Sequence, residues 1–456
     1  MVDVIVVGMG PGGESVAGEL AAAGLSVVGV ESRLVGGECP YYGCIPSKMM
    51  IRAANALAEA RRVPGLAGTA SVVPDFSMVA RRIRDEATDN WDDAVAAKRF
   101  TDKGGRLVRG TGRLGGAREV TVRMHDGGEI AFRARHAVVL NPGTNPAIPS
   151  VPGLAGTPYW TNREAMRAAE APASLLISGG GAIAVELAQV FARFGTRVSV
   201  VARGPLLSRE EPEAGELLAK VFAREGIEVL DHTNFTSVSH DGDGFTVKLE
   251  GSASGVGQLR AEQLLIATGR TPALEALGLD AAGIAYDGKT PPAVDAHLQL
   301  ADGLYLVGDA VGAGAFTHMS MYQGNIVAGH ILGEDRGQAD THAVPHVTFT
   351  DPEIGGVGMS EKQARDAGLA IRVGYTDLAD STRGWIHRAE GFIKVIKDAG
   401  TGVLVGATSA GPDGGEVLSA LTLAVHARIP VATLKTMIYA YPTFHRAIGE
   451  ALNDLK

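Results

Sequence analysis

The feature that most constrains the fold is a strand–glycine–helix unit that occurs twice in the chain. The first copy has an apolar strand at 4–7 and an alanine-rich helix that ends near residue 23, and a further strand follows at 26–30. The other copy has a strand at 174–178, a helix through residue 194 and a strand at 197–202. Strands that alternate with helices form parallel sheets with right-handed crossovers. The sequence therefore predicts an α/β fold with a duplicated nucleotide-binding unit.

The first glycine loop, "GMGPGGE", has the spacing of a phosphate cradle. In this pattern the first glycine makes the tight turn, the second lets a pyrophosphate approach the backbone, and the third lets helix and strand pack closely. The N-terminus of the helix then faces the negative phosphates. Glu31 ends the next strand, where a carboxylate can accept a hydrogen bond from a ribose hydroxyl. We therefore predict a Rossmann-like dinucleotide site that includes Gly8, Gly10, Gly13 and Glu31.

The second glycine loop, "GGGAIAVE", is followed by a strand that ends differently from the strand after the first loop. Gly179 and Gly181 keep the first two positions, and Ala184 takes the third. The next strand ends without an acidic residue, and Arg203 and Arg209 come after it. A ribose 2′-hydroxyl is bound by a carboxylate, whereas a 2′-phosphate is bound by guanidinium groups. The sequence therefore favours NADPH over NADH here, with two ordinary surface arginines as the alternative interpretation.

Length and charge limit the class of protein. A chain of 456 residues exceeds a single small core, so we expect about two to four domains. Lys+Arg 42 against Asp+Glu 51 gives a net charge of −9, which does not favour nucleic acid or an anionic membrane as a partner. No apolar stretch approaches the roughly 20 residues that a spanning helix needs, and the apolar start is typical of a first strand rather than a signal peptide. We therefore expect a soluble, cytoplasmic protein.

Cys39 and Cys44 are the only cysteines, and both lie in the loop "GGECPYYGCIPSK". A chain with so few cysteines fits a reducing compartment, where a disulfide is more often catalytic than structural. Zinc is disfavoured because no second Cys/His pair lies nearby in the sequence. Cys44 precedes a helical stretch with Pro46 in its first turn, and a thiol at a helix N-terminus has a lowered pKa. The pair alone leaves a structural disulfide and a redox couple open.

These motifs together resemble the FAD-dependent pyridine nucleotide–disulfide oxidoreductases, a family that includes glutathione reductase, dihydrolipoamide dehydrogenase and mercuric reductase. The resemblance spans essentially the full length of the chain. Within the family, the motifs look most like those of mercuric reductase. It implies a relay in which NADPH reduces FAD and FAD reduces a cysteine pair. The motifs that carry it are the three loops above together with "IATGRTP", "LYLVGDA" and "FTDPEIGGVG".

The resemblance implies catalytic roles for four residues. Cys39 matches the interchange cysteine, which reacts with the external substrate, and Cys44 matches the charge-transfer cysteine beside the flavin. Lys48 matches the lysine near flavin N5, and Glu186 matches its partner glutamate. Further cofactor-binding positions that the resemblance implies are Gly37, Lys48, Gly143, Gly269, Arg270, Gly308 and Asp309.

The C-terminal stretch "YAYPTFHRAIGEAL" departs from the disulfide-reducing members of the family. Those members carry a proton-shuttling histidine here, contributed by the dimer partner, and a glutamate that orients it. Tyr441 occupies the histidine position, and Arg446 occupies the glutamate position. A phenol is a poor base near neutral pH, and the adjacent His445 is a candidate substitute. A homodimer is implied, in which this stretch completes the partner's site.

The acceptor stays open between three chemical classes. The departure at Tyr441 is shared with mercuric reductase, yet this chain lacks that enzyme's C-terminal cysteine pair. Soluble transhydrogenases also carry tyrosine here but lack the full cysteine pair. We therefore expect a thiol or disulfide, a thiophilic metal ion or a quinone-like compound as the acceptor, with a dihydrolipoamide dehydrogenase-like enzyme as an alternative. No resident metal is expected.

The resemblance and the composition divide the chain into domains. A Pro/Gly-rich stretch at 141–153 indicates a crossing between domains, and strands of a mixed sheet are expected after about residue 346. The fold class is therefore α/β, with two Rossmann-like domains and a C-terminal α+β dimerisation domain. The expected bounds are 1–150 and 273–342 for the FAD-binding domain in two parts, 151–272 for the NAD(P)H-binding domain, and 343–456 for the dimerisation domain.

Overall fold

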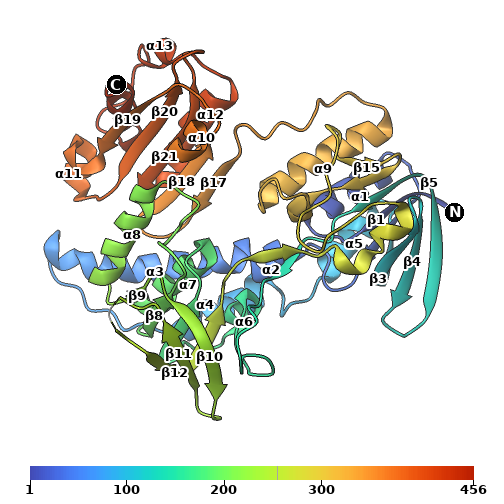
Figure 1. Cartoon of the computed structure of the whole chain (residues 1–456), viewed down its shortest axis with the longest axis horizontal. Helices are drawn as coiled ribbons and strands as arrows, with labels where there is room; N and C mark the ends of the chain where they lie inside the picture. Colours follow the sequence, from blue (N-terminus) through green and yellow to red (C-terminus); the bar gives the residue numbers. More distant parts are fainter. Residues whose placement is uncertain (254, 456) are drawn as a thin grey trace. The chain divides into compact units, whose positions relative to one another are not determined.

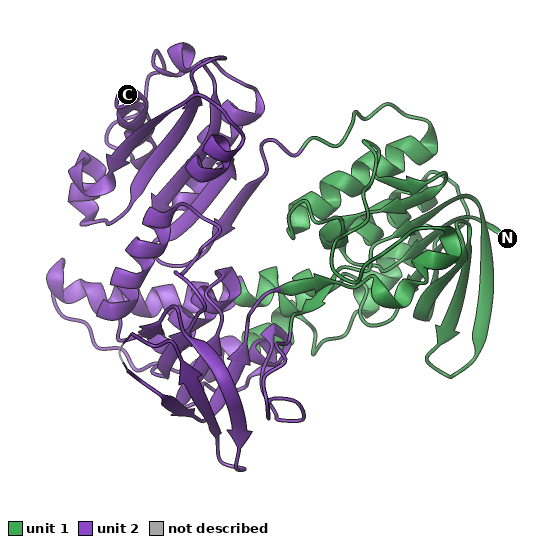
Figure 2. Cartoon of the chain, in the orientation of Figure 1, with its two compact units in different colours: residues 1–47, 81–147, 270–340 green, residues 48–80, 148–269, 341–456 purple. Residues whose placement is uncertain are grey.

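A computed structural model of the chain describes residues 1–253 and 255–455. The chain forms two compact units, each built from segments that are far apart in the sequence (Figure 2). Unit 1 consists of Met1–Ser47, Arg81–Ala147 and Arg270–Asp340. Unit 2 consists of Lys48–Ala80, Ile148–Gly269 and Thr341–Lys456.

Unit 1 is built on a seven-stranded sheet with the order β1-β2-β3-β4-β5-β16-β15, in which β1 also pairs with β5. Five strands lie parallel in the order β3-β2-β1-β5-β16, whereas β4 and β15 run antiparallel to their neighbours. The strands are β1 (Val2–Val7), β2 (Val27–Glu31), β3 (Arg106–Gly116), β4 (Glu119–Met124), β5 (Glu129–Leu140), β15 (Gln299–Ala301) and β16 (Leu304–Leu306).

The central strand β1 is buried on both faces. Val4 and Val6 pack into one apolar cluster with residues of α1 (Pro11–Ala22) and α9 (Thr317–Leu332). Ile5 packs into a second cluster on the opposite face of the sheet. A parallel strand covered on both sides needs a continuous run of β-branched residues, and this is what the sequence of β1 provides.

Two short strands mark where the chain leaves unit 1 and returns to it. β6 (Thr144–Pro146) and β14 (Arg270–Pro272) pair antiparallel, with Thr144 opposite Pro272. The Pro/Gly-rich stretch of the sequence therefore forms one half of a two-stranded crossing.

The first part of unit 2 contains a four-stranded parallel sheet with the order β13-β7-β8-β9 and a three-stranded antiparallel sheet, β10-β11-β12. Its long helices are α3 (Cys44–Arg62), which begins in unit 1, α7 (Ala182–Arg193) and α8 (Pro212–Arg224). The strands are β7 (Ser174–Ser178), β8 (Arg197–Val201), β9 (Glu228–Leu230), β10 (Asn234–His240), β11 (Phe245–Glu250), β12 (Gln258–Ala261) and β13 (Gln263–Ile266).

The C-terminal part of unit 2 is a five-stranded sheet with the order β17-β18-β21-β20-β19, and α12 (Gly414–His426) packs along β18 and β21 (Figure 1). Every neighbouring pair is antiparallel, so the expectation of a mixed sheet is wrong. The reason is that short turns join β17 to β18 and β20 to β21, and a short turn reverses the chain. The strands are β17 (Pro345–Thr348), β18 (Glu353–Gly358), β19 (Ile371–Asp377), β20 (Phe392–Asp398) and β21 (Leu404–Gly411).

The helices that the structure describes are not suited to a membrane span. Within the described chain, none combines the length and the apolar character that crossing a bilayer requires.

Candidate active site and coenzyme loops

The two cysteines lie at the junction of two helices. Cys39 is in the short helix α2 (Glu38–Tyr42), Gly43 separates the helices, and Cys44 is the first residue of α3. Both are free thiols, Cys39 half-buried and Cys44 exposed. The adjacent Cys44 and partial burial raise the pKa of the Cys39 thiol. The two thiols therefore interact directly, and this interaction favours the protonated form of Cys39.

Two further contacts hold this junction in place. Gly37 precedes α2 with φ +68, and a Cβ on it would lie 2.8 Å from the Cα of Gly10 in the first glycine loop. The Cys44 Sγ lies 3.4 Å from the Oγ1 of Thr317, the first residue of α9. The cysteine loop is thus packed against the glycine loop and against the start of α9. Sequence reasoning missed Thr317, because nothing in the sequence links it to a residue so far away.

Lys48 lies one helical turn beyond Cys44 in α3 and binds Glu186 of α7. The Lys48 Nζ lies 3.1 and 2.9 Å from the two carboxylate oxygens, and the Glu186 side chain is only 7% exposed. The same Nζ lies 4.5 Å from the centroid of the Phe349 ring. The structure therefore brings together the lysine and the glutamate that the resemblance pairs. It adds Phe349, whose only signal in the sequence is its place at the start of the "FTDPEIGGVG" motif.

The first glycine loop has the shape that a bound pyrophosphate needs. Gly8 has φ +94, and a Cβ on it would lie 2.1 Å from the Asn141 carbonyl oxygen. A Cβ on Gly13 would lie 2.0 Å from the Gly8 carbonyl oxygen. Gly10 is the N-cap of α1, so no side chain lies between a ligand and the start of that helix. These residues fit the diphosphate of FAD.

Glu31 is buried at the end of β2, beside this loop. Its carboxylate accepts hydrogen bonds from the backbone N–H groups of Met9 and Arg33, both at 2.7 Å. Burial raises the pKa of Glu31, and the two backbone donors oppose that rise. The carboxylate is thereby held in one orientation, with lone pairs left for ribose hydroxyls.

Asp309 and Arg270 meet at Thr144, near the β6–β14 crossing. The Thr144 hydroxyl donates to the Asp309 carboxylate at 3.3 Å and accepts from the Arg270 Nε at 2.6 Å. Burial raises the pKa of Asp309, and Arg270 opposes that rise. Three glycines of the predicted set have positive φ in the adjoining segments: Gly143 (φ +66), Gly269 (φ +133) and Gly308 (φ +80). Thr144 was not predicted, although its place directly after Gly143 was a signal.

The second glycine loop repeats the backbone of the first. Gly179 has φ +130, and a Cβ on it would lie 2.2 Å from the Ala267 carbonyl oxygen. Gly181 is the N-cap of α7. Arg203 and Arg209 are both exposed in the segment after β8, and within residues 1–253 and 255–455 neither forms a hydrogen bond or an ion pair. Their guanidinium groups are available to a phosphate.

The C-terminal stretch presents Tyr441 at the surface of unit 2. Its side chain is 66% exposed, and its hydroxyl donates to the Thr382 Oγ1 at 3.2 Å. The guanidinium of Arg446 lies 5.4 Å from the Tyr441 ring centroid. His445 instead lies 6.0 Å from the ring of Tyr439. The two proton-transfer candidates of the sequence therefore have different neighbours.

The described residues offer no ligand set for a resident metal. Among the residues that the structure describes, no group of three or more His, Cys, Asp or Glu side chains is arranged to hold a metal ion.

The sequence model of the pyridine nucleotide-disulphide oxidoreductases matches residues 2–324, and the model of their dimerisation domain matches residues 344–452. The chain belongs to this family. The oxidoreductases of this family use FAD and a pyridine nucleotide, and the resemblance drawn from the motifs is confirmed.

Known oxidoreductases align over nearly the whole chain. A mercuric reductase from Acidithiobacillus ferrooxidans is 34% identical over 448 residues, which cover 95% of this chain and 79% of that protein. A dihydrolipoyl dehydrogenase from Thermus scotoductus is 32% identical and covers 99% and 97%. The Cu(II) complex of RclA, an HOCl-induced flavoprotein disulfide reductase from Escherichia coli, superposes with a TM-score of 0.86 at 26% identity over 100% of this chain and 99% of that one. The predicted fold class is confirmed.

Proposed function

We propose that this oxidoreductase takes electrons from NADPH and passes them through FAD to a Cys39–Cys44 couple, and from there to a thiol, disulfide or thiophilic acceptor. The observation that carries the proposal is the helix α3. It begins at Cys44, where the two thiols interact, and one turn later it carries Lys48 bound to Glu186. A structural disulfide has no need of this ion pair beside it.

FAD, when bound, supplies a two-electron carrier between the nicotinamide and the cysteine pair. The residues that would hold it are the first glycine loop, Glu31, and the cluster of Asp309, Thr144 and Arg270. Lys48 would place its positive charge where the reduced ring is negative, in line with the resemblance. The NADPH phosphates would lie on the second glycine loop, with Arg203 and Arg209 on the 2′-phosphate.

The two cysteines have different roles in this proposal: Cys39 reacts with the acceptor, and Cys44 contacts the flavin. Two electrons and one proton convert the Cys39–Cys44 disulfide into one thiol and one thiolate. Because Cys44 raises the pKa of Cys39, the remaining proton stays on Cys39. Cys39 must lose that proton before it attacks an acceptor, so a base has to be near it. Tyr441, His445 or water takes the place of the histidine of the family in this proposal.

The acceptor classes differ in how many protons they take up. Breaking a disulfide requires a proton for the leaving thiolate, and reducing a quinone to a hydroquinone takes up two protons, whereas reducing Hg(II) to the metal takes up none. The mercuric reductase relatives and Tyr441 therefore favour a metal-ion acceptor, RclA and the dihydrolipoyl dehydrogenases favour a disulfide, and a quinone is a further candidate. Turnover of reduced enzyme with each class distinguishes these candidates.

Assembly and location are part of the same proposal. The match to the dimerisation domain supports a homodimer, and the exposed Tyr441 would then complete the site of the partner subunit. The domain bounds of 1–150, 151–272, 273–342 and 343–456, and a cytoplasmic location, are also proposed.

The proposal is tested by anaerobic titration of the holoenzyme with NADPH, monitored by visible absorption. Reduced enzyme should develop a long-wavelength band from a thiolate in contact with oxidised flavin. Cys39→Ser should show that band without any reductant, because Cys44 matches the charge-transfer cysteine beside the flavin and can no longer form a disulfide, and Cys44→Ser should lack it. A band that persists in Cys44→Ser would contradict the assignment. The reduced wild-type enzyme is then mixed with a disulfide, Hg(II) and a quinone in turn to find the acceptor.

A further inference from the structure

Three residues on one face of α7 contact the turn between β17 and β18. Glu186, Gln189 and Arg193 recur at helical spacing and so share that face. The Glu186 carboxylate accepts the backbone N–H of Phe349 at 2.8 Å. Gln189 accepts the backbone N–H of Asp351 at 2.7 Å and donates to its carbonyl at 2.9 Å, and Arg193 donates to the Asp351 carboxylate at 2.8 Å.

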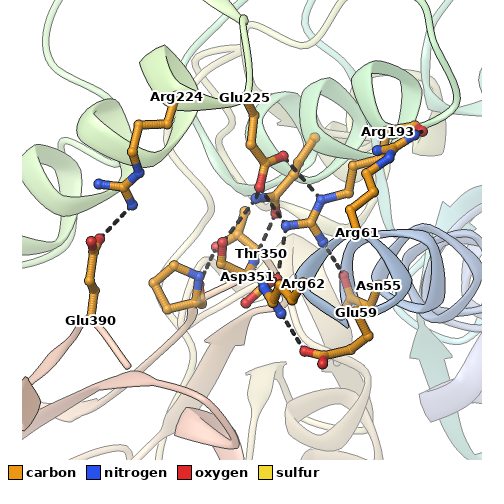
Figure 3. A network of polar contacts seen from close by, with 12 residues as sticks. Asn55, Glu59, Arg61, Arg62, Arg193, Arg224, Glu225, Thr350, Asp351 and Glu390 are labelled. Carbon is orange, nitrogen blue, oxygen red and sulfur yellow. Dashed lines mark hydrogen bonds and ion pairs between the residues drawn. The ribbon is translucent and has the colours of Figure 1, made fainter. Parts of the chain in front are cut away.

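At the Asp351 end of this contact, charged groups hold the turn in place. Arg193 is only 2% exposed, and its guanidinium donates to Asn55 of α3 at 2.6 Å and to Glu225 at 2.6 and 3.0 Å. Arg62 of α3 also binds the Asp351 carboxylate, at 2.5 Å (Figure 3). Burial alone would raise the pKa of Asp351, but Arg193 and Arg62 together hold it below its ordinary value. Asp351 is therefore a fixed carboxylate that ties the turn to both helices.

At the Phe349 end, the same contact reaches Lys48. The ammonium has the Glu186 carboxylate at 2.9 Å and the Phe349 ring centroid at 4.5 Å. An aromatic face attracts a cation, by roughly 0.5–1 kcal/mol at an exposed site and more where water is excluded. Phe349 thus acts on both members of the pair, through its ring on Lys48 and through its N–H on Glu186.

We propose that Phe349, Gln189 and Asp351 are positioning residues for Lys48. Gln189 and Asp351 fix the turn on α7, the turn fixes Phe349, and Phe349 confines the ammonium against Glu186. The ammonium keeps one place because three elements, α3, α7 and the β17–β18 turn, meet around it. This inference goes beyond the proposed function and rests on it in one respect, the role of Lys48 at the flavin.

The variants separate positioning from folding. Phe349→Leu removes the ring and keeps the N–H to Glu186, and Phe349→Tyr restores the ring. Gln189→Met keeps the length of the side chain and removes both hydrogen bonds to Asp351. Glu390→Gln is the matched control, because it breaks an exposed ion pair with Arg224 in the same region (Figure 3), with the two side chains 48% and 56% exposed.

The readout is the midpoint potential of the bound flavin, measured in the holoenzyme by equilibration with a reference dye, with thermal unfolding in parallel. A cation held beside the flavin stabilises the negative charge of its reduced form, so Lys48→Gln should shift the potential to more negative values. Phe349→Leu and Gln189→Met should shift it in the same direction by a smaller amount. Phe349→Tyr and Glu390→Gln should stay at the wild-type value.

The outcomes are distinct. If Lys48→Gln shifts the potential and neither Phe349→Leu nor Gln189→Met does, the positioning role is wrong and the role of Lys48 stands. If Lys48→Gln itself leaves the potential unchanged, the proposed role of Lys48 fails. Should Gln189→Met fail to fold, the comparison of Phe349→Leu with Phe349→Tyr decides the question alone.

Discussion

The glycine loops after β1 and β7 are two copies of one backbone device. In each, the first glycine has a positive φ and packs onto the chain that leaves the neighbouring parallel strand. Gly8 meets the carbonyl of Asn141, which comes after β5, and Gly179 meets the carbonyl of Ala267, which comes after β13. The hypothetical Cβ distances, 2.1 and 2.2 Å, are nearly equal. The close approach of two strands therefore fixes the first glycine in both copies, whatever nucleotide binds.

The copies differ where the second strand ends. After β1 the next strand ends at Glu31, which is buried and held by two backbone N–H groups. After β7 the next strand is followed by Arg203 and Arg209, which are exposed. A buried carboxylate presents a fixed acceptor, whereas exposed guanidinium groups close on a phosphate only when it arrives. In the proposed function, the loop therefore provides the phosphate site and the strand end selects the nucleotide.

The largest effect is expected from Gly8→Ala. The new Cβ would clash with the Asn141 carbonyl in a backbone conformation that costs an alanine about 1–2 kcal/mol, before any clash is counted. We expect FAD content to fall on the order of tenfold or more, measured as the ratio of flavin to protein absorbance in purified enzyme.

Gly24→Ala is the matched control for Gly8→Ala. Gly24 has φ +90 in the same unit, and a Cβ on it would have no heavy atom within 4 Å. Gly24→Ala therefore introduces the same kind of backbone strain as Gly8→Ala but no steric clash. Equal loss of FAD in both variants would mean that the contact with Asn141 is not what the loop requires.

A smaller and more selective effect is expected from Gly179→Ala. The same kind of clash, now with the Ala267 carbonyl, lies at the second loop. We expect normal FAD content and normal reduction by dithionite, but reduction by NADPH slowed by about tenfold or more in stopped-flow experiments. Gly195→Ala, at a position with φ +99 and open space, serves as the control. Loss of FAD from Gly179→Ala would mean that the two loops do not serve separate nucleotides.

The sequence was sufficient where the local fold depends on short motifs. Both glycine loops, the cysteine loop and the family could be predicted, because each motif lies within one strand–turn–helix segment. The contacts of Phe349 and Gln189 could not be predicted, since they join the β17–β18 turn to a helix about 160 residues earlier and use a backbone N–H that every residue except proline has. The contact between Thr317 and Cys44 could not be predicted either, because the two residues are far apart along the chain.

The smallest effect, and the most selective test of the strand ends, comes from replacing Arg203 and Arg209 together with glutamine. If both bind the 2′-phosphate, KM for NADPH should rise by about tenfold, since hydrogen bonds to a charged group contribute roughly 1.5–3 kcal/mol each and exposure to solvent reduces that. KM for NADH should stay within about twofold, because NADH has no 2′-phosphate. Arg197→Gln, an exposed arginine at the other end of β8, controls for the loss of surface charge. Equal increases for the two coenzymes would show that the arginines act on the whole loop and do not select the nucleotide.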